Sequence, residues 1–506
     1  MAKAQPKTKH FSYHPPVTIA VSTNATKSTH LSLQFQVSEG KDGKQTGKKS
    51  KKTESSGQPE FKGGAKSFFL MRDAANPNQS VQLIAGLGPK ADVTSEKLRQ
   101  IGAILYGKLQ ADQLNGLSVS YNEFSKAFGK NASGFLSAFL EGFGLASYKF
   151  DKYKSKPTKS DSQSIELVGD SRSAKLLEEL VWRTEIILDC IFVTRDFSNE
   201  PSNFGTPEYY ADSIEKIAKE CGIKCTILND KDALKEKMGL FLSVGHGSER
   251  ESRVVVLEYS PKGAKKTLSL VGKGVTFDSG GISLKPGMKM EDMKHDMTGA
   301  ATMLGATLAA ARLGAKSKIV TVLVFCENMP SGNATQPGNV VRGRNGKTVE
   351  INNTDAEGRL ILADALDLAQ DHKPNLVIDA ATLTGACTVA LGKLASALFV
   401  NDDGLLKIFE NATQKTDELL WQLPLWDEYF DDLKSATADM MNVANDGAGG
   451  TIRGAIFLKQ FVKPETKWAH MDIANRAYDL GNVPYHPRKG ATGAYVRFLT
   501  QLALDF

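Results

Sequence analysis

Hydrophobic and polar positions divide the chain into two regions of different character. In the first region the pattern is mixed, with a strand expected over residues 81–88 and helices over 95–110 and 132–148. The stretch 152–164 that follows is polar and has no apolar periodicity, which is typical of a linker. The pattern therefore predicts a smaller N-terminal α/β domain over residues 1–165.

A long helical pattern over residues 173–197 comes next and is interpreted as an interdomain helix. Beyond it, apolar strand-like runs cover residues 253–259, 267–277, 318–327, 375–383 and 396–401, and helices are expected near 208–220, 299–313, 358–371 and 404–416. Continuous apolar strands separated by helices are typical of a largely parallel sheet covered on both faces. We therefore expect a larger C-terminal α/β domain over residues 173–506, with a central mixed, largely parallel sheet. Ligands of such sheets bind outside the carboxyl ends of the strands.

Composition adds few constraints. The chain is 41% hydrophobic and 24% charged, as in soluble globular proteins. It has no apolar run of the roughly 18 residues that a membrane helix needs, and its first residues lack a secretory signal, so we expect a cytoplasmic protein with no membrane partner. Its five cysteines, an odd number, do not form a disulfide framework and indicate reduced thiols.

The net charge of +6 is small for 506 residues, and much of it comes from a lysine run over residues 41–52. Residues 39–67 around this run are rich in Gly, Ser and Lys, which predicts a basic flexible insertion in the N-terminal domain. The rest of the chain is nearly neutral. Charge therefore does not favour a nucleic-acid-binding protein, and binding of nucleic acid by the lysine run is kept only as a secondary alternative.

Two acids stand two positions apart in NTDAEGRL, residues 353–360. Thr354 and Glu357 have the spacing of a capping box, and Asp355 would be favoured there by the helix dipole, so one interpretation is an ordinary helix start. Against it, Gly358 costs about 1 kcal/mol in the first turn of a helix. Positions i and i+2 do not face each other on a helix, whereas an irregular turn can direct both carboxylates at one point. This stretch alone leaves both interpretations open.

The segment 271–306 holds further polar candidates at a predicted strand end, namely Lys273, Asp278, Lys285 and Asp296. Taken singly, Asp296 could cap the next helix, Lys285 could be a solvated lysine, and Lys273 could bind phosphate after a glycine-rich turn. Neither GxxxxGK[ST] nor GxGxxG occurs, so a nucleotide cradle is disfavoured. Glycines crowded around an acid and two lysines favour a site over unrelated single roles.

Two other hydrolytic chemistries lack their motifs. HExxH and GxSxG are both absent, which removes support for a single-zinc protease and for a serine hydrolase. His246 is interpreted as a structural loop histidine. His295 is not expected to be a ligand, because the side chains of adjacent residues, here His295 and Asp296, usually diverge.

Together, VGKGVTFDSGGISLK (271–285), MKHDMTGAA (293–301), NTDAEGRL and DAATLTGA (379–386) resemble the leucyl aminopeptidase family, also called cytosol aminopeptidases. The similarity extends over essentially all of residues 173–506, whereas the basic insertion departs from the family pattern. The resemblance implies that the larger domain is a catalytic aminopeptidase domain, a metalloprotease-type hydrolase that releases N-terminal amino acids from peptides. Leucine and other apolar first residues are the expected substrates, and a cytoplasmic homohexamer is the expected assembly.

Carried over position by position, the resemblance implies a site of three parts. Two divalent ions (Zn, Mn, Mg or Co) would be held by Lys273, Asp278, Asp296, Asp355 and Glu357. Lys285 and Arg359 match the two catalytic positions, with a bicarbonate ion at Arg359. The substrate would be bound by Met293, Thr382, Leu383, Gly385 and Ala474.

These residue types suit that chemistry. Two like charges 4 Å apart repel by about 4 kcal/mol at an effective dielectric constant of 20, so four gathered carboxylates require cations among them. A lysine amine can be a ligand only when neutral, and an adjacent dication lowers its pKa. A pair of ions can generate a bridging hydroxide that attacks the peptide carbonyl. The Lys285 ammonium would then stabilise the developing oxyanion.

Overall fold

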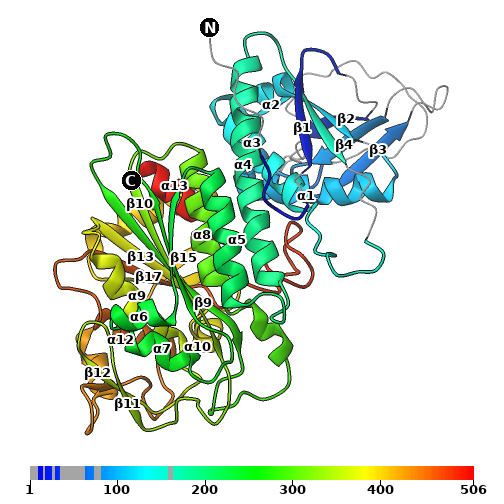
Figure 1. Ribbon diagram of the computed structural model, residues 1–506. Helices are drawn as coiled ribbons and strands as arrows, with labels where there is room; N and C mark the ends of the chain where they lie inside the picture. Colours follow the sequence, from blue (N-terminus) through cyan, green and yellow to red (C-terminus); the bar gives the residue numbers. More distant parts are fainter. Residues whose placement is uncertain are drawn as a thin grey trace, which may run out of the picture. The chain divides into compact units, whose positions relative to one another are not determined.

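The computed structural model describes residues 9–14, 17–25, 29–34, 63–72, 81–114, 116–157 and 163–506 (Figure 1). Residues 39–62 of the predicted basic insertion, with its lysine run, lie outside these ranges. The chain forms two compact units. Unit 1 comprises Met1–Thr8, Pro16–Leu188 and Val483–Tyr485, and unit 2 comprises Lys9–Pro15, Asp189–Asn482 and His486–Phe506.

Unit 1 is an α/β unit built on a six-stranded sheet of order β1-β6-β5-β2-β4-β3. Neighbouring strands run parallel except for the edge strand β3, which is antiparallel to β4. Helices α1 and α3 pack against each other, and their apolar faces share one core with the sheet. The elements are β1 (Thr18–Ser22), β2 (Thr29–Gln34), β3 (Phe68–Arg72), β4 (Val81–Gly86), α1 (Ser95–Ala111), β5 (Leu117–Ser120), α2 (Tyr121–Phe128), α3 (Ala132–Leu145) and β6 (Ser164–Val168).

Unit 2 contains an eight-stranded sheet and a small three-stranded sheet. Its strands are β7 (Lys224–Leu228), β8 (Arg253–Tyr259), β9 (Thr267–Asp278), β10 (Lys318–Asn328), β11 (Asn339–Arg342), β12 (Thr348–Ile351), β13 (Leu376–Ala381), β14 (Ser396–Val400), β15 (Leu420–Gln422), β16 (Met440–Met441) and β17 (Trp468–Asp472). Its helices are α5 (Pro207–Glu220), α6 (Asp230–Lys235), α7 (Gly239–Gly245), α8 (Thr298–Arg312), α9 (Gly358–Gln370), α10 (Gly385–Leu391), α11 (Leu406–Thr416), α12 (Gly450–Lys459) and α13 (Val496–Asp505). Helix α4 (Ala174–Asn199) runs through the boundary between the units.

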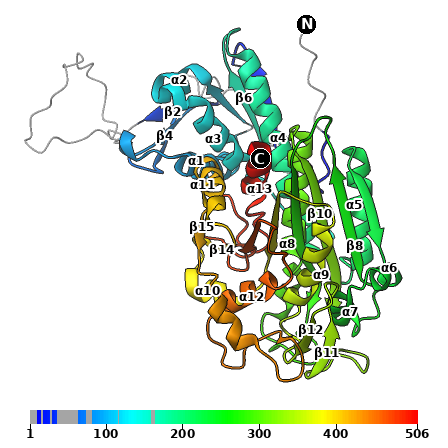
Figure 2. The same ribbon diagram turned by 90° about the vertical axis from the view of Figure 1, so that its left-hand side faces the viewer.

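The eight-stranded sheet has the order β15-β14-β17-β13-β9-β10-β8-β7, and its four central strands β17, β13, β9 and β10 are parallel. Antiparallel pairs occur between β14 and β17, between β10 and β8, and between β8 and β7. The small sheet has the order β11-β12-β16, and Figures 1 and 2 both show β11 and β12 beside α7. The predicted α/β class with a mixed, largely parallel sheet is confirmed.

Helices α8 and α9 cover opposite faces of the central strands. On one face, a Cβ added at Gly272 of β9 would lie 2.5 Å from Cα of Ala300 in α8, and one added at Gly299 would lie 2.3 Å from the carbonyl oxygen of Ala380. Small residues therefore bring α8 close to the sheet. On the other face, the buried side chain of Val271 packs in one cluster with apolar residues of α7 and α9. Lys273, two residues after Val271 on β9, lies on this second face, beside Gly358 of α9.

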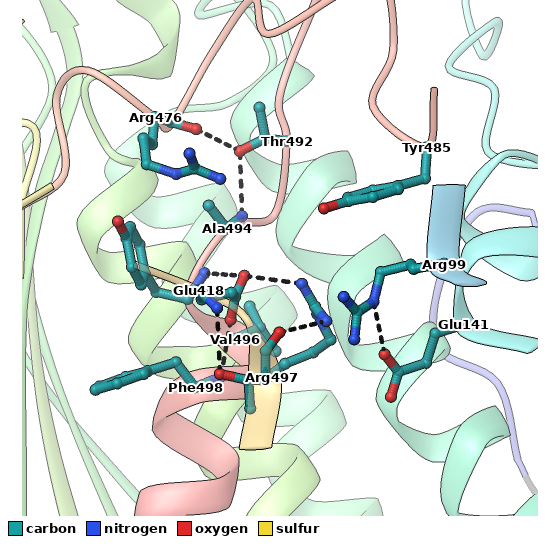
Figure 3. Close-up of polar contacts among 12 residues, drawn as sticks. Arg99, Glu141, Glu418, Arg476, Tyr485, Thr492, Ala494, Val496, Arg497 and Phe498 are labelled. Atoms are coloured by element: carbon teal, nitrogen blue, oxygen red, sulfur yellow. Dashed lines mark hydrogen bonds and ion pairs between the residues drawn. The ribbon is translucent and has the colours of Figure 1, made fainter. Parts of the chain in front are cut away.

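The C-terminal helix α13 is capped from a distant segment (Figure 3). The buried Glu418 carboxylate accepts hydrogen bonds from the backbone N–H groups of Tyr495 and Phe498, both at 2.8 Å. Arg497 donates to the carbonyl oxygen of Thr416 at 2.9 Å. Carboxylates are favoured at helix N-termini, where they satisfy orphan N–H groups and complement the dipole. Glu418 thereby attaches α13 to the segment that leads into β15.

The first described residues belong with unit 2. The Asp189 carboxylate, which is fully buried in α4, accepts hydrogen bonds from the backbone of Phe11 (2.9 Å) and Ser12 (3.2 Å) and pairs with Arg312 of α8 at 2.6 Å. Tyr13 donates its N–H to Asp196 at 2.7 Å. This N-terminal strap, residues Lys9–His14, is thus fixed to α4 and α8.

Most predicted elements are confirmed within one to four residues. The helix predicted over 173–197 is α4, and the helices predicted near 208–220, 299–313, 358–371 and 404–416 are α5, α8, α9 and α11. Short strands such as β15 and β16 were not predicted. In the described part of the chain, no helix is both long and apolar enough to cross a bilayer.

Candidate metal centre

Polar residues gather where the four central parallel strands end. Asp278, Asn328 and Asp472 are the last residues of β9, β10 and β17, and Thr382 directly follows β13. Because these strands are parallel and adjacent, their carboxyl ends lie along one edge of the sheet. This is the edge at which the sequence predicted a ligand.

A β-bulge directs both Lys273 and Asp278 of β9 to this site. Side chains alternate along a strand, so residues five positions apart would normally lie on opposite faces. The pairing of β9 with β10 advances from Val275 to Phe277 while β10 advances by a single residue, which leaves Thr276 as the extra residue. One inserted residue returns the side chain of Asp278 to the face on which Lys273 lies. Lys273 and Asp278 therefore reach the same group of carboxylates.

Lys273 is buried among acids. Its ammonium lies 2.8 Å from Oδ2 of Asp296 and 2.9 Å from Oε1 of Glu357, and it donates to the carbonyl oxygen of Thr382 at 2.8 Å. The Thr382 hydroxyl donates to Oδ1 of Asp296 at 2.6 Å. These contacts join three chain segments around one amine.

Lys285 joins the remaining two acids. Its ammonium lies 2.7 Å from Oδ2 of Asp278 and forms a second ion pair with Oδ1 of Asp355. One ligand oxygen of each of Asp278, Asp355 and Glu357 lies within 4.8 Å of the others, which is the spacing of a group that can hold a metal ion. The structure thus brings together all five predicted metal ligands and the predicted catalytic lysine.

The electrostatics of the site reflect crowding of acids in a buried place. Burial and the charge of Glu357 raise the pKa of Asp278 to about 6, and burial raises the pKa of Asp296 to about 8 despite the adjacent Lys273. Burial opposes the charged form of Lys273 as well, but Asp296, Glu357 and Asp278 together raise its pKa above the ordinary value. Burial also disfavours ionised Glu357, yet the two lysines hold its pKa below the ordinary value. Two ammonium groups do not fully compensate four carboxyl groups.

The acids of NTDAEGRL lie on a turn, and the capping-box interpretation is wrong. Helix α9 begins at Gly358, with Glu357 as its N-cap residue and no side-chain capping bond. The Thr354 hydroxyl instead donates to the carbonyl oxygen of Gly280 at 2.7 Å and accepts from the N–H of Ser283 at 2.8 Å. Asp296 does not cap α8 either, whose N-cap residue is Met297. Neither Asp296 nor Glu357 caps a helix with its side chain, so both carboxylates can face the site.

Two glycines explain how the turns approach each other. Gly280 has a φ of +88°, and a Cβ there would lie 2.5 Å from the carbonyl oxygen of Ser283 and 3.1 Å from Oδ1 of Asp355. A Cβ on Gly358 would lie 2.6 Å from Cε of Lys273. A side chain at either position would fill the space that the acids and the lysine occupy.

Arg359, the second predicted catalytic residue, is a buried cation in the first turn of α9. Its guanidinium donates to the carbonyl oxygen of Asn442 at 2.7 Å, and burial lowers its pKa to about 10. Arginine remains charged even then, so the site holds a desolvated positive charge beside Glu357.

The predicted substrate residues lie in the surrounding loops. Asp472 accepts hydrogen bonds from the N–H groups of Leu383 and Ala474, each at 3.2 Å, which draws these two loops together. Gly385 begins α10, and Met293 lies in the 3₁₀ helix Met290–His295, where its carbonyl oxygen accepts from the N–H of Asp296. Asp472 thus connects Leu383 with Ala474, and the hydroxyl of Thr382 contacts Asp296.

Several residues of the site were not predicted. Asn328 donates its side-chain N–H to Oδ1 of Asp278 (2.8 Å) and to the carbonyl oxygen of Thr354 (3.0 Å), so it joins both acidic turns. Its position at the end of a central strand was the available signal. Asn442 and Asp472 had no such signal, because β16, which Asn442 follows, and β17, which Asp472 ends, were not predicted. His295 is half-buried, and its ring stacks on Tyr478 with ring centroids 4.4 Å apart, as expected for a histidine with a structural role.

The residues fit a divalent-metal centre. Carboxylate oxygens are preferred by hard divalent cations, and carboxyl groups whose pKa values are raised by burial and by neighbouring acids become favourably ionised when dications bind. The glycine at 280 leaves the space that such a cluster requires. A two-domain α/β fold with this cluster at the strand ends defines a metallohydrolase type of protein.

Comparisons with known proteins identify the family. Residues 192–500 match the catalytic domain of the cytosol aminopeptidase family, and residues 44–157 match the N-terminal domain of the same family. The chain is 40% identical over 452 residues to a probable cytosol aminopeptidase of Geotalea uraniireducens (88% of this chain, 89% of the relative). It is 42% identical over 422 residues to one of Geobacter sulfurreducens (83% and 84%). The chain belongs to the cytosol aminopeptidase family and is a metalloaminopeptidase, a hydrolase.

A solved structure is similar over nearly the whole chain. The bottromycin maturation enzyme BotP superposes with a TM-score of 0.82 at 32% identity, covering 95% of this chain and 99% of BotP. BotP has also been solved in complex with Mn, with the same TM-score. This likeness agrees with the dinuclear metal dependence of the family.

Proposed function

We propose that this chain removes N-terminal amino acids from peptides, with leucine and other apolar residues preferred, at the edge of the sheet where β9, β10, β13 and β17 end. The observation that carries the proposal is the convergence of Asp278, Asp296, Asp355 and Glu357 on Lys273 and Lys285. Two divalent ions held by Lys273 and these four acids would lower the pKa of water to give a hydroxide nucleophile, and would polarise the peptide carbonyl.

The chain's own residues have separate tasks in this proposal. Lys285 is partly exposed, with 21% of its side chain accessible, so its ammonium can reach a substrate. It would stabilise the oxyanion that forms when the first carbonyl of the peptide is attacked. Arg359 is a buried cation suited to holding a small anion such as bicarbonate, which would transfer a proton to the leaving amine.

The preference for leucine rests on the loops around the acids. Met293, Thr382, Gly385 and Ala474 would surround the first side chain of the peptide, and the backbone at Leu383 would bind the peptide itself. Leucine buries about three more carbon atoms than alanine, which is about 2 kcal/mol, or roughly 30-fold in kcat/KM. A free α-amine is required, so an N-acetylated leucyl amide should not be cleaved.

The decisive experiment is Asp355→Asn, compared with Asp403→Asn as a matched control on an exposed acid. We expect Asp355→Asn to lose hydrolysis of leucyl amide and to bind fewer than two metal ions per chain by elemental analysis, with the fold retained by circular dichroism. Asp403→Asn should match the wild type. Full activity of Asp355→Asn, or full activity of wild-type protein after exhaustive chelation, would refute the proposal.

Assembly and location are also part of the proposal. A cytoplasmic homohexamer is expected, and analytical ultracentrifugation of the full chain measures the assembly directly. If the protein is a monomer with full activity, the proposed hexamer is wrong, whereas the proposed metal centre is unaffected. The native metal is identified by elemental analysis of protein purified without added metal.

A further inference from the structure

Asn442 lies directly beyond the short strand β16. Met441 pairs with Glu350 of β12, and the N–H of Asn442 donates to the carbonyl oxygen of Glu350 at 3.0 Å. Strand β12 ends at Ile351, immediately before the turn that carries Asp355 and Glu357. The pairing of β16 with β12 therefore places Asn442 against the start of that turn, and its side chain is fully buried.

The Asn442 side chain binds the acidic turn with both of its polar atoms. Its Oδ1 accepts from the N–H groups of Asn352 (3.0 Å) and Asn353 (3.4 Å). Its Nδ2 donates to the carbonyl oxygens of Asn353 (2.7 Å) and Ala356 (3.4 Å). These partners flank Asp355 on both sides, so one amide holds the backbone before and after this acid.

The main chain of the same residue holds the buried arginine. Its carbonyl oxygen accepts from Nη1 of Arg359 at 2.7 Å. Arg359 is only 7% exposed, so few conformations are available to its side chain. The acidic turn and the guanidinium are thus positioned by one residue that comes from a separate part of the chain.

We infer that Asn442 is a positioning residue, which sets Asp355 and Glu357 for metal binding and aligns Arg359 with them. This inference rests on the proposed function of those three residues. Side chains that orient metal ligands through hydrogen bonds typically contribute about 10–100-fold to metal affinity or activity. Asn442 acts here through backbone groups of the turn.

The alternative is that Asn442 only stabilises the fold. Buried amides do so generally, since a buried polar group left without a hydrogen-bond partner destabilises the folded state. A structural role would lower the free energy of unfolding without changing metal affinity or kcat of the folded protein. A positioning role changes metal affinity and kcat more than KM, because the groups it aligns act in the transition state.

The test compares Asn442→Ala with Asn445→Ala in the full chain. Asn445 is exposed and accepts from the Asn352 side chain at 3.0 Å, so it contacts the same turn from the solvent side. We expect Asn442→Ala to weaken Mn²⁺ binding by 10-fold or more in calorimetric titrations and to lower kcat by a similar factor, with KM within about threefold. Asn445→Ala should change neither quantity. Wild-type Mn²⁺ affinity and kcat in folded Asn442→Ala would overturn the inference.

A second variant covers the case in which Asn442→Ala does not fold. Asn442→Asp has the same shape and keeps the Oδ1 acceptor for Asn352 and Asn353, but it presents an oxygen to the carbonyl groups of Asn353 and Ala356. It should lose Mn²⁺ affinity and kcat as Asn442→Ala does, and wild-type values would again overturn the inference. Asp355→Asn is measured in parallel. If that variant keeps its metal and activity, the proposed function fails, whereas if only the Asn442 variants are unchanged, the positioning role fails.

Discussion

Gly358→Ala offers a strong test of how the site is built, because two effects of opposite sign compete there. Replacing glycine by alanine within a helix stabilises it by about 1 kcal/mol. At Gly358, however, the new Cβ would meet Cε, Nζ and Cδ of Lys273 at 2.6, 2.7 and 2.8 Å, where ordinary contacts are 3.4–4 Å. The lysine must therefore retreat by about 1 Å.

The structure gives the cost of that retreat. Lys273 is fully buried and is fixed by contacts with Asp296, Glu357 and the carbonyl oxygen of Thr382, all at 2.8–2.9 Å. Hydrogen bonds of charged groups contribute about 1.5–3 kcal/mol each, so weakening one of them outweighs the helical gain. We expect a net loss of about 1 kcal/mol in the free energy of unfolding and a loss of metal affinity of at least 10-fold.

Urea unfolding and calorimetric Mn²⁺ titration measure the two effects separately. The control is Gly134→Ala in the first turn of α3, where a new Cβ has no neighbour within 4 Å and a gain of up to about 1 kcal/mol is expected. The two substitutions should thus change the free energy of unfolding in opposite directions, and the two changes should differ by about 2 kcal/mol. A Gly358→Ala variant that gains stability and keeps wild-type Mn²⁺ affinity would show that this close contact does not determine the position of Lys273.

Three further outcomes are expected. Glu418→Ala should lower the free energy of unfolding by about 3 kcal/mol, because two buried N–H groups of α13 lose their acceptor. Glu410→Ala, on an exposed site of α11, is the control. Equal stability of the two variants would contradict the capping role of Glu418. Glu258 has its pKa lowered to about 2 by hydrogen bonds from Lys224 and Lys318, so its stabilising effect is present above pH 4.5 and is lost as the pH falls towards 2. The free energy of unfolding of the wild type should therefore fall more steeply than that of Glu258→Gln over this interval, by about 1 kcal/mol after allowance for solvent screening, and parallel curves would contradict the assignment. Finally, Lys285→Ala should abolish leucyl amide hydrolysis while it retains bound metal, and unchanged turnover would exclude oxyanion stabilisation by this lysine.

The sequence pointed to the acidic and basic residues of the site because they cluster among glycines after a predicted strand, and the family resemblance implied their roles. Lys273 and Asp278 beside glycines could be found in this way, and so could the acids of NTDAEGRL. The correct choice between a capped helix and an irregular turn required the structure, because Thr354 has the right spacing for a cap and is diverted only by Gly280 and Ser283 from another segment. The local sequence does not show that a distant segment competes with the helix N-terminus for the Thr354 hydroxyl.

The residues that were missed share a physical reason. Asn442 lies after a two-residue strand whose pairing depends on β12, about 90 positions earlier in the chain. Asp472 ends a strand whose apolar run is interrupted by His470, which pairs with Asp379 inside the sheet. Hydrophobic periodicity detects neither case, since both elements are stabilised by distant partners.

The N-terminal strap, Lys9–His14, has a consequence for dissecting the protein. Unit 2 takes Lys9–Pro15 from ahead of Pro16–Leu188, which forms most of unit 1, so unit 2 is not one continuous stretch of the sequence. A recombinant fragment begun at Ala174 would expose the Asp189 carboxylate that Phe11 and Ser12 cover in the intact chain. Cleavage of the chain at a single linker therefore does not yield a complete unit 2, because the strap that bonds to Asp189 and Asp196 is lost with unit 1.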